Sequence, residues 1–193
     1  MSLIRFLSLN NHYLTPQICW ENRFRGNSRK TCKVTVDGTD CRIYEPKPFN
    51  KKWFSHKFWK AGLRYEVAVC IKTGDIVWTN GPFPCGRWPD IRIFRRNLIR
   101  MLGFGEMVEA DLGYRGEPNY VRTPHNYLSR SDRRAKKKTR ARHETVNKRL
   151  KDFRCLSSVF RHERRDHQPC FLACAVVTQI SFESGDRPWQ ISY

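Results

Sequence analysis

The sequence lacks a long hydrophobic run and paired cysteines, and it has few acidic residues. Its longest apolar stretch, residues 170–177, is far shorter than the ~20 residues that a membrane-spanning helix needs. The eight cysteines are scattered with no Cys-x-x-Cys pair, which is typical of reduced thiols in a reducing compartment. Residues 1–7 carry a charge inside their apolar part and no small-residue cleavage site. We therefore expect no secretory signal, disulfide scaffold or membrane anchor.

The shortage of acids leaves the chain strongly basic. Against 37 Lys and Arg residues stand 18 Asp and Glu, which gives a net charge of +19 and a pI near 10.0. Such a surplus favours a polyanionic partner, and nucleic acid fits better than a neutral metabolite. Hydrophobic residues make up 39% and aromatic residues 13%, which is typical of a globular chain rather than a disordered one.

The 193 residues suit one domain, residues 32–193, behind a basic and loosely ordered lead-in, residues 1–31. β-Branched residues predict a strand over 33–43, and the period-two alternation over 63–72 predicts another. Thr73-Gly74-Asp75 then turns the chain into a returning strand at 76–79. These three strands are expected to form an antiparallel meander.

Helical periodicity dominates the second half of the chain. Apolar residues recur at helical spacing over 91–102, and again at Val146, Leu150 and Phe153. Between these two helices, residues 107–111 read as a short buried strand. Residues 168–182 are apolar almost all round and predict a helix packed over the sheet.

Three acids follow these elements in order. Asp37 lies within the first strand, Asp111 at the end of the short strand, and Glu144 on the polar face of the helix, nearly opposite Val146. Each has an ordinary alternative: a strand-ending turn for the two aspartates, and a solvated helix with i,i+4 ion pairs for Glu144. A fourth acid, Asp90, stands at a helix start, where a carboxylate is favoured by the free N–H groups.

Some cysteines and histidines offer a third possibility, a zinc site. The residue types suit zinc, but their spacing matches no common site, and two of the cysteines fall inside the apolar helix. The set comprises Cys155, His162, His167, Cys170 and Cys174.

The order of the three acids, with the residues around them, resembles the catalytic domain of PIF/Harbinger-type transposases, a DDE-superfamily endonuclease group. The residues that carry the resemblance are 36–40, 86–90, 110–114, 140–144 with Asn147, Leu150 and Lys151, and 178–179. Arg140, Glu144 and Lys151 also have the spacing of related bacterial insertion-sequence transposases. Those relatives carry a tyrosine where this chain has Lys137.

The resemblance implies a fold and a site. The fold is α/β, a ribonuclease H-like mixed sheet flanked by helices, with three antiparallel strands followed by parallel ones. Asp37, Asp111 and Glu144 become the catalytic carboxylates and ligands of Mg²⁺ or Mn²⁺, most simply two ions. Asp90 becomes a fourth ligand or the helix cap.

The resemblance also implies DNA as substrate, a nuclear location, a separate Myb-like DNA-binding partner and a homo-oligomer. Arg140 and Lys151 are expected to contact phosphate or to orient Glu144. The alternative function is a catalytically inactive or domesticated remnant that only binds nucleic acid. The candidate DNA contacts are Arg133, Arg134, Lys136, Lys137, Lys138, Arg140, Lys148 and Lys151.

Overall fold

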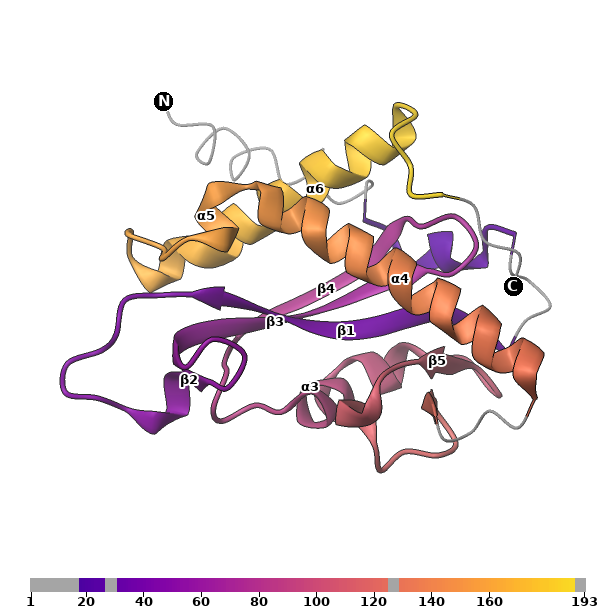
Figure 1. Cartoon of the computed structure of the whole chain (residues 1–193), viewed down its shortest axis with the longest axis horizontal. Helices are drawn as coiled ribbons and strands as arrows, with labels where there is room; N and C mark the ends of the chain where they lie inside the picture. The colour runs from indigo at the N-terminus through magenta and orange to yellow at the C-terminus, as the bar shows by residue number, and fades with distance from the viewer. Residues whose placement is uncertain (1–17, 27–30, 125–128, 190–193) are drawn as a thin grey trace.

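The computed structural model describes residues 18–26, 31–124 and 129–189, and its centre is a mixed six-stranded sheet (Figure 1). The strand order is β2-β3-β1-β5-β6, and β4 pairs with β3. The strands are β1 (Cys32–Arg42), β2 (Phe54–Ser55), β3 (Lys60–Cys70), β4 (Ile76–Pro84), β5 (Met107–Glu109) and β6 (Val121–Arg122).

Half of the sheet is antiparallel. β3 pairs antiparallel with both β1 and β4, and Val36 lies opposite Ala68. The predicted first strand and the predicted hairpin are therefore confirmed. β4 runs further than expected, to Pro84, where Leu63 is its partner.

The other half of the sheet is parallel. β5 runs parallel to β1, with Thr35 opposite Glu109, and β6 runs parallel to β5. The predicted change from antiparallel to parallel strands is confirmed. β1 and β5 therefore point the same way, and β1 continues to Arg42 whereas β5 ends at Glu109.

Helices cover both faces of the sheet. The helices α4, α5 and α6 lie over one face, and α3 lies under the other (Figure 1). The α-helices are α3 (Asp90–Arg96), α4 (Arg130–Asp152), α5 (Arg154–Ser157) and α6 (His167–Glu183). The 3₁₀ turns are η1 (Trp20–Phe24), η2 (Lys51–Trp53), η3 (Leu98–Met101), η4 (Leu112–Tyr114) and η6 (Arg164–Asp166).

Period-two alternation along the strands supplies both hydrophobic cores. Val67 packs with Leu150 of α4 and Phe171 of α6, while its neighbour Ala68 packs with Phe94 of α3. Both faces of β3 are therefore covered, as expected for a sheet between two helical layers.

Three boundaries differ from the sequence prediction. The helix expected over 91–102 is divided into α3 and η3, and Asn97 between them has non-helical backbone angles. The basic run 130–142 is itself helical. α4 begins there because Ser129 caps it by accepting a hydrogen bond from the Asp132 amide, and because Lys, Arg and Ala are good helix formers.

The third difference lies in the lead-in. Residues 18–26 include the η1 turn, and Arg23 within it is buried against Glu106, with 2.8 Å between Nε and Oε1. The rest of the expected lead-in, residues 1–17 and 27–30, lies outside the described residues. Among the described helices, none combines the length and the apolar composition that crossing a membrane requires.

Candidate active site

Asp37 projects from β1 toward α4. Val34 and Val36 pack on the α3 side, so the alternate residues Thr35 and Asp37 face the other way. The Asp37 carboxylate accepts hydrogen bonds from the Gly38 amide at 2.8 Å and from Nδ2 of Asn147, on α4, at 3.3 Å. The side-chain orientation predicted from the alternation is confirmed.

Asp111 reaches the same region from the neighbouring strand. It lies two residues beyond Glu109, as Asp37 lies two residues beyond Thr35, and these two strand residues are register partners. Asp111 is exposed, and its carboxylate accepts a hydrogen bond from the Gly113 amide at 2.8 Å. The turn-capping alternative is therefore confirmed for Asp111, and its role in the site stays a prediction.

Glu144 comes from α4, whose orientation is held by its neighbour His143. The buried His143 ring is hydrogen-bonded through Nδ1 to Thr35 Oγ1, which ties this turn of the helix to β1. Glu144 itself is exposed and accepts a hydrogen bond from Nε of Arg140 at 2.9 Å. The i,i+4 pair expected for a solvated helix is therefore present.

All three acids line one cavity of about 310 Å³. The structure thus brings together residues that are 33 to 107 positions apart in the chain. Within the described ranges, however, the three carboxylates do not gather within 4.8 Å of one another. They are spread around the wall of the cavity. Its lining comprises Thr35, Val36, Asp37, Glu109, Ala110, Asp111, Pro124, Arg133, Lys136, Lys137, Thr139, Arg140, His143 and Glu144.

Asp90 lies on the α3 side of β1 and does not line this cavity. A Cβ atom added to Gly38 would lie 2.1 Å from Asp90 Oδ1, so only glycine leaves room for this carboxylate. Asp90 is the first residue of α3, where Pro89 holds the cap position and no side-chain capping bond is present. Its carboxylate is instead 3.3 Å from Nη1 of Arg64. Asp90 thus makes an ion pair in place of the capping bond, and its alternative role as a fourth metal ligand stays a prediction.

The charges around Asp37 oppose one another. Burial raises the pKa of this carboxyl, the nearby Lys57 ammonium lowers it, and the negative charge of Asp111 raises it again. Lys57 Nζ lies 2.5 Å from the Gly38 carbonyl oxygen. Burial likewise raises the pKa of Asp90, against the guanidinium of Arg64. Like charges gathered at partly buried carboxylates favour a bound cation.

The basic residues of α4 divide into two groups. Six of the eight candidate DNA contacts are exposed: Arg133, Arg134, Lys137, Lys138, Arg140 and Lys148. Arg133, Lys137 and Arg140 line the cavity beside the acids. Positive charge therefore borders the carboxylates of the cavity.

The other two lysines make internal contacts. Lys136 Nζ donates to Glu109 Oε2 at 2.7 Å and to the Ala110 carbonyl at 2.9 Å. Lys151 Nζ donates to the carbonyls of Asp40 and Leu156. The structure thus places Lys151 against β1 and α5 rather than beside Glu144.

Two residues near the acids carried no predicted role. Asn147 contacts Asp37, and its position three residues after Glu144 on a helix was the available signal. Lys57 stands among alternating bases and aromatics, and nothing in that pattern indicates contact with β1. The position of Lys57 depends on the turn between β2 and β3, and the spacing of residues in the sequence does not specify the path of that turn.

The donor set fits a divalent cation. Carboxylate oxygens are hard ligands of the kind that Mg²⁺ and Mn²⁺ prefer. The negative charges of Asp37 and Asp111 repel each other, and a bound divalent cation would offset that repulsion. The carboxylates that line the cavity belong to Asp37, Glu109, Asp111 and Glu144, and Glu109 is paired with Lys136 at 2.7 Å. Asp37, Asp111 and Glu144 are therefore the candidate ligands.

Comparison with known proteins agrees with this arrangement. The family model described as DDE superfamily endonuclease matches residues 36–179, which is 144 of the 193 residues and spans all three acids. Endonucleases of this superfamily generally use divalent metal ions. No solved structure matches the chain.

A curated relative is the probable transposase for insertion sequence element IS702 of Microchaete diplosiphon. It is 29% identical over 145 residues, which cover 68% of this chain and 51% of the relative. The chain thus spans about half the length of that protein. Because the family model covers most of the chain and every acid of the cavity, the chain belongs to the DDE superfamily endonucleases.

Proposed function

We propose that the chain is the ribonuclease H-like catalytic domain of a metal-dependent DNA endonuclease of the PIF/Harbinger transposase type. The observation that carries the proposal is the convergence of Asp37, Asp111 and Glu144, from two parallel strands and a helix, on one cavity. The matches to the endonuclease family and to a probable transposase support it.

In this proposal the three acids hold the ions and the surrounding residues hold the acids. Bound Mg²⁺ or Mn²⁺, most simply two ions, would supply charge stabilisation at the scissile phosphate and activation of the attacking water. The Gly38 amide and Asn147 orient the Asp37 carboxylate. Second-sphere bonds of this kind tune metal ligands. Arg140 holds Glu144 and offers its remaining guanidinium N–H groups to phosphate.

DNA binding is proposed for the exposed side of α4. Arg133 and Lys137 stand at the cavity and would contact phosphates on either side of the scissile bond. The resemblance extends the proposal to a nuclear location, a Myb-like DNA-binding partner and a homo-oligomer. Transposition by a whole protein is a proposal as well, since the chain spans half of its relative.

The test is cleavage of a labelled DNA duplex with Mg²⁺ or Mn²⁺ by the full chain and by the Asp37→Asn and Glu144→Gln variants. Both variants should lose more than ~100-fold in rate, because even outer-shell partners of metal ligands are worth 10–100-fold. Glu163→Gln is the matched control, since Glu163 is an exposed acid that pairs with Arg165 outside the cavity. It should cleave as the unmodified chain does.

A different outcome would identify the alternative function. Salt-sensitive DNA binding without metal-dependent cleavage, and unchanged in all three variants, would make the chain a nucleic-acid-binding remnant. Cleavage that survives both site substitutions would contradict the assignment of the acids.

A further inference from the structure

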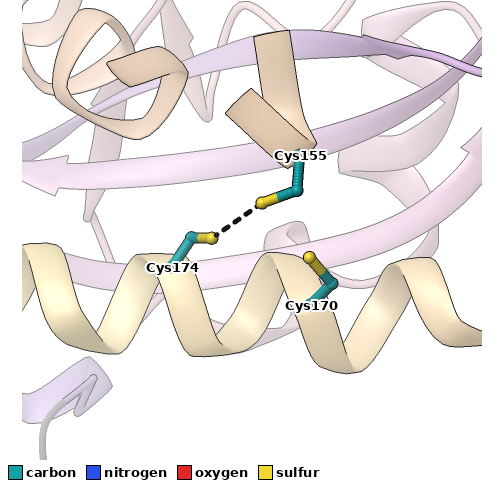
Figure 2. Close-up of side chains that lie close together, drawn as sticks. All are labelled: Cys155, Cys170 and Cys174. Carbon is teal, nitrogen blue, oxygen red and sulfur yellow. Dashed lines mark hydrogen bonds between the residues drawn. The ribbon is translucent and has the colours of Figure 1, made fainter. Parts of the chain in front are cut away.

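Three cysteine side chains meet between α5 and α6 (Figure 2). Cys155 projects from α5, and Cys170 and Cys174 project from adjacent turns of α6. Their three Sγ atoms all lie within 4.8 Å of one another, and the Cys155 and Cys174 sulfurs are 3.5 Å apart. Elsewhere in the described ranges, no three Asp, Glu, His or Cys side chains bring their ligand atoms so close.

The spacing of the sulfurs suits a thiolate metal site. Zinc binds thiolates at ~2.3 Å with tetrahedral geometry, so neighbouring sulfurs on one ion are roughly 3.8 Å apart. A disulfide would require two sulfurs at ~2.0 Å and would leave the third unused. The observed distance is close to the first value, and all three sulfurs take part.

The surroundings also suit an ion. Cys170 and Cys174 are 4% and 6% exposed, whereas Cys155 is only half-buried and gives access from solvent. Cysteines that merely fill an apolar core have no need to point their sulfurs at one another.

The two histidines of the zinc set considered from the sequence are not part of this cluster. His167 is fully buried, and its Nδ1 is 2.8 Å from the Tyr65 hydroxyl. His162 is exposed on the connecting loop. Of that set, only the three cysteines bring their ligand atoms together.

We propose that Cys155, Cys170 and Cys174 bind one zinc ion, with the fourth position open to solvent on the Cys155 side. The ion ties α5 to α6. α5 in turn receives Lys151 of α4 at its Leu156 carbonyl, and the loop beyond it forms a β-bridge from Phe160 to Ile43. The site thus braces the carboxyl end of the helix that carries Glu144, without sharing a residue with the cavity.

The experiment is a cobalt titration of the full chain after reduction with a phosphine, followed by absorption spectroscopy. Thiolate-bound tetrahedral Co²⁺ should give a near-ultraviolet charge-transfer band and strong visible bands that saturate at one equivalent, and Zn²⁺ should abolish them. Carboxylate-bound Co²⁺ gives no sulfur charge-transfer band, so the spectrum separates this site from the acidic cavity.

Variants locate the signal. Cys155→Ser and Cys174→Ser should lose the charge-transfer band, and the half-buried Cys155 is the safer of the two for folding. Cys19→Ser, which removes another half-buried cysteine, and Asp37→Asn should both keep it. The proposal is overturned if the unmodified chain shows no charge-transfer band, if the band survives in Cys155→Ser, or if the purified chain contains a Cys155–Cys174 disulfide and takes up no metal.

Discussion

At the scale of single residues, Glu66 shows how burial between the sheet and its helical layers raises the pKa of a carboxyl group. It lies on β3 opposite Gly38, is fully buried, and accepts a hydrogen bond from Trp78 Nε1 at 3.2 Å. Burial raises the pKa of its carboxyl to about 8. We therefore expect Glu66 to be largely uncharged in the folded chain at neutral pH, and the negative charge of Asp90 raises its pKa further.

This residue predicts a pH dependence of stability. A carboxyl whose folded-state pKa exceeds its unfolded value costs nothing below pH ~4.5 and destabilises the folded state as the pH rises toward 8. Glu66→Gln removes that cost. Relative to the unmodified chain, its free energy of unfolding should gain roughly 3 kcal/mol between pH 4.5 and pH 7.

Urea denaturation at pH 4.5, 7 and 8.5 measures this change, and Glu163→Gln is the exposed control. The difference between Glu66→Gln and the unmodified chain should grow up to pH 8 and then level off. Parallel curves across that range would show that Glu66 is ionised in the folded state.

The same residue marks a limit of sequence analysis. Alternation through Tyr65, Val67 and Val69 identified β3 and predicted which residues share a face. The alternation of Val34 and Val36 with Thr35 likewise predicted the direction of the Asp37 side chain. Alternation along β3 does not say whether the face opposite Tyr65 and Val67 is exposed. The burial of Glu66 on that face follows only from the packing of α3 against the sheet.

At the scale of elements, α4 is fastened to the sheet by a buried arginine. Arg142 is 1% exposed, and its guanidinium donates to the carbonyls of Ile71 at 2.7 Å and Lys72 at 2.9 Å, and to that of Trp189. These carbonyls lie at the β3–β4 turn and near the end of the described chain. One side chain thus gives the buried Ile71 carbonyl a donor and ties α4 to the β3–β4 turn and to Trp189.

Replacing this arginine should destabilise the chain strongly. Arg142→Met keeps much of the volume but leaves the buried Ile71 carbonyl without its donor, which costs about 1–3 kcal/mol. Arg134→Met, on an exposed part of the same helix, should change the free energy of unfolding by less than ~0.5 kcal/mol. Chemical denaturation compares the two variants directly, and equal losses would mean that the Arg142 contacts do not anchor α4.

The boundaries of α4 show why element predictions failed where they did. Apolar periodicity at Val146 and Leu150 predicted its second half. The first half, from Arg130, carries no apolar stripe because the sheet no longer lies beneath much of it, and Arg133 and Lys137 there face the cavity instead. Helices that hold a site in place of a core lose the hydrophobic pattern by which they are recognised.

At the scale of the whole molecule, the position of the acids depends on topology that sequence order does not contain. The order of Asp37, Asp111 and Glu144 along the chain could be taken from the sequence. The parallel register of β1 and β5, which places Asp37 and Asp111 at the same height in the sheet, could not. Helical spacing places Arg140 beside Glu144, but no local pattern places Arg133 and Lys137 at the same cavity. Sequence analysis therefore named the three acids, and the sheet pairing with the packing of α4 brings them to one cavity.

The net charge of +19 predicts salt-sensitive DNA binding, and the structure says where that sensitivity should reside. Each phosphate neutralised contributes about 0.9 to the slope of log affinity against log salt for duplex DNA. Arg133 and Lys137 line the cavity, so the double Arg133→Gln, Lys137→Gln variant should lower the slope by about 1.8. Lys47, in the loop after β1, and Lys51, the first residue of η2, are both exposed. Their double replacement by Gln removes the same charge elsewhere.

The measurement is binding to a short duplex, by fluorescence anisotropy, over a series of salt concentrations. If the DNA backbone passes over α4, the Arg133→Gln, Lys137→Gln variant should show a smaller salt slope and a lower affinity for DNA. The Lys47 and Lys51 variant should keep the salt slope of the unmodified chain. If both variants lose equally, the net charge acts diffusely and α4 is not the binding face. The comparison separates position from total charge, because both variants carry +17 where the unmodified chain carries +19.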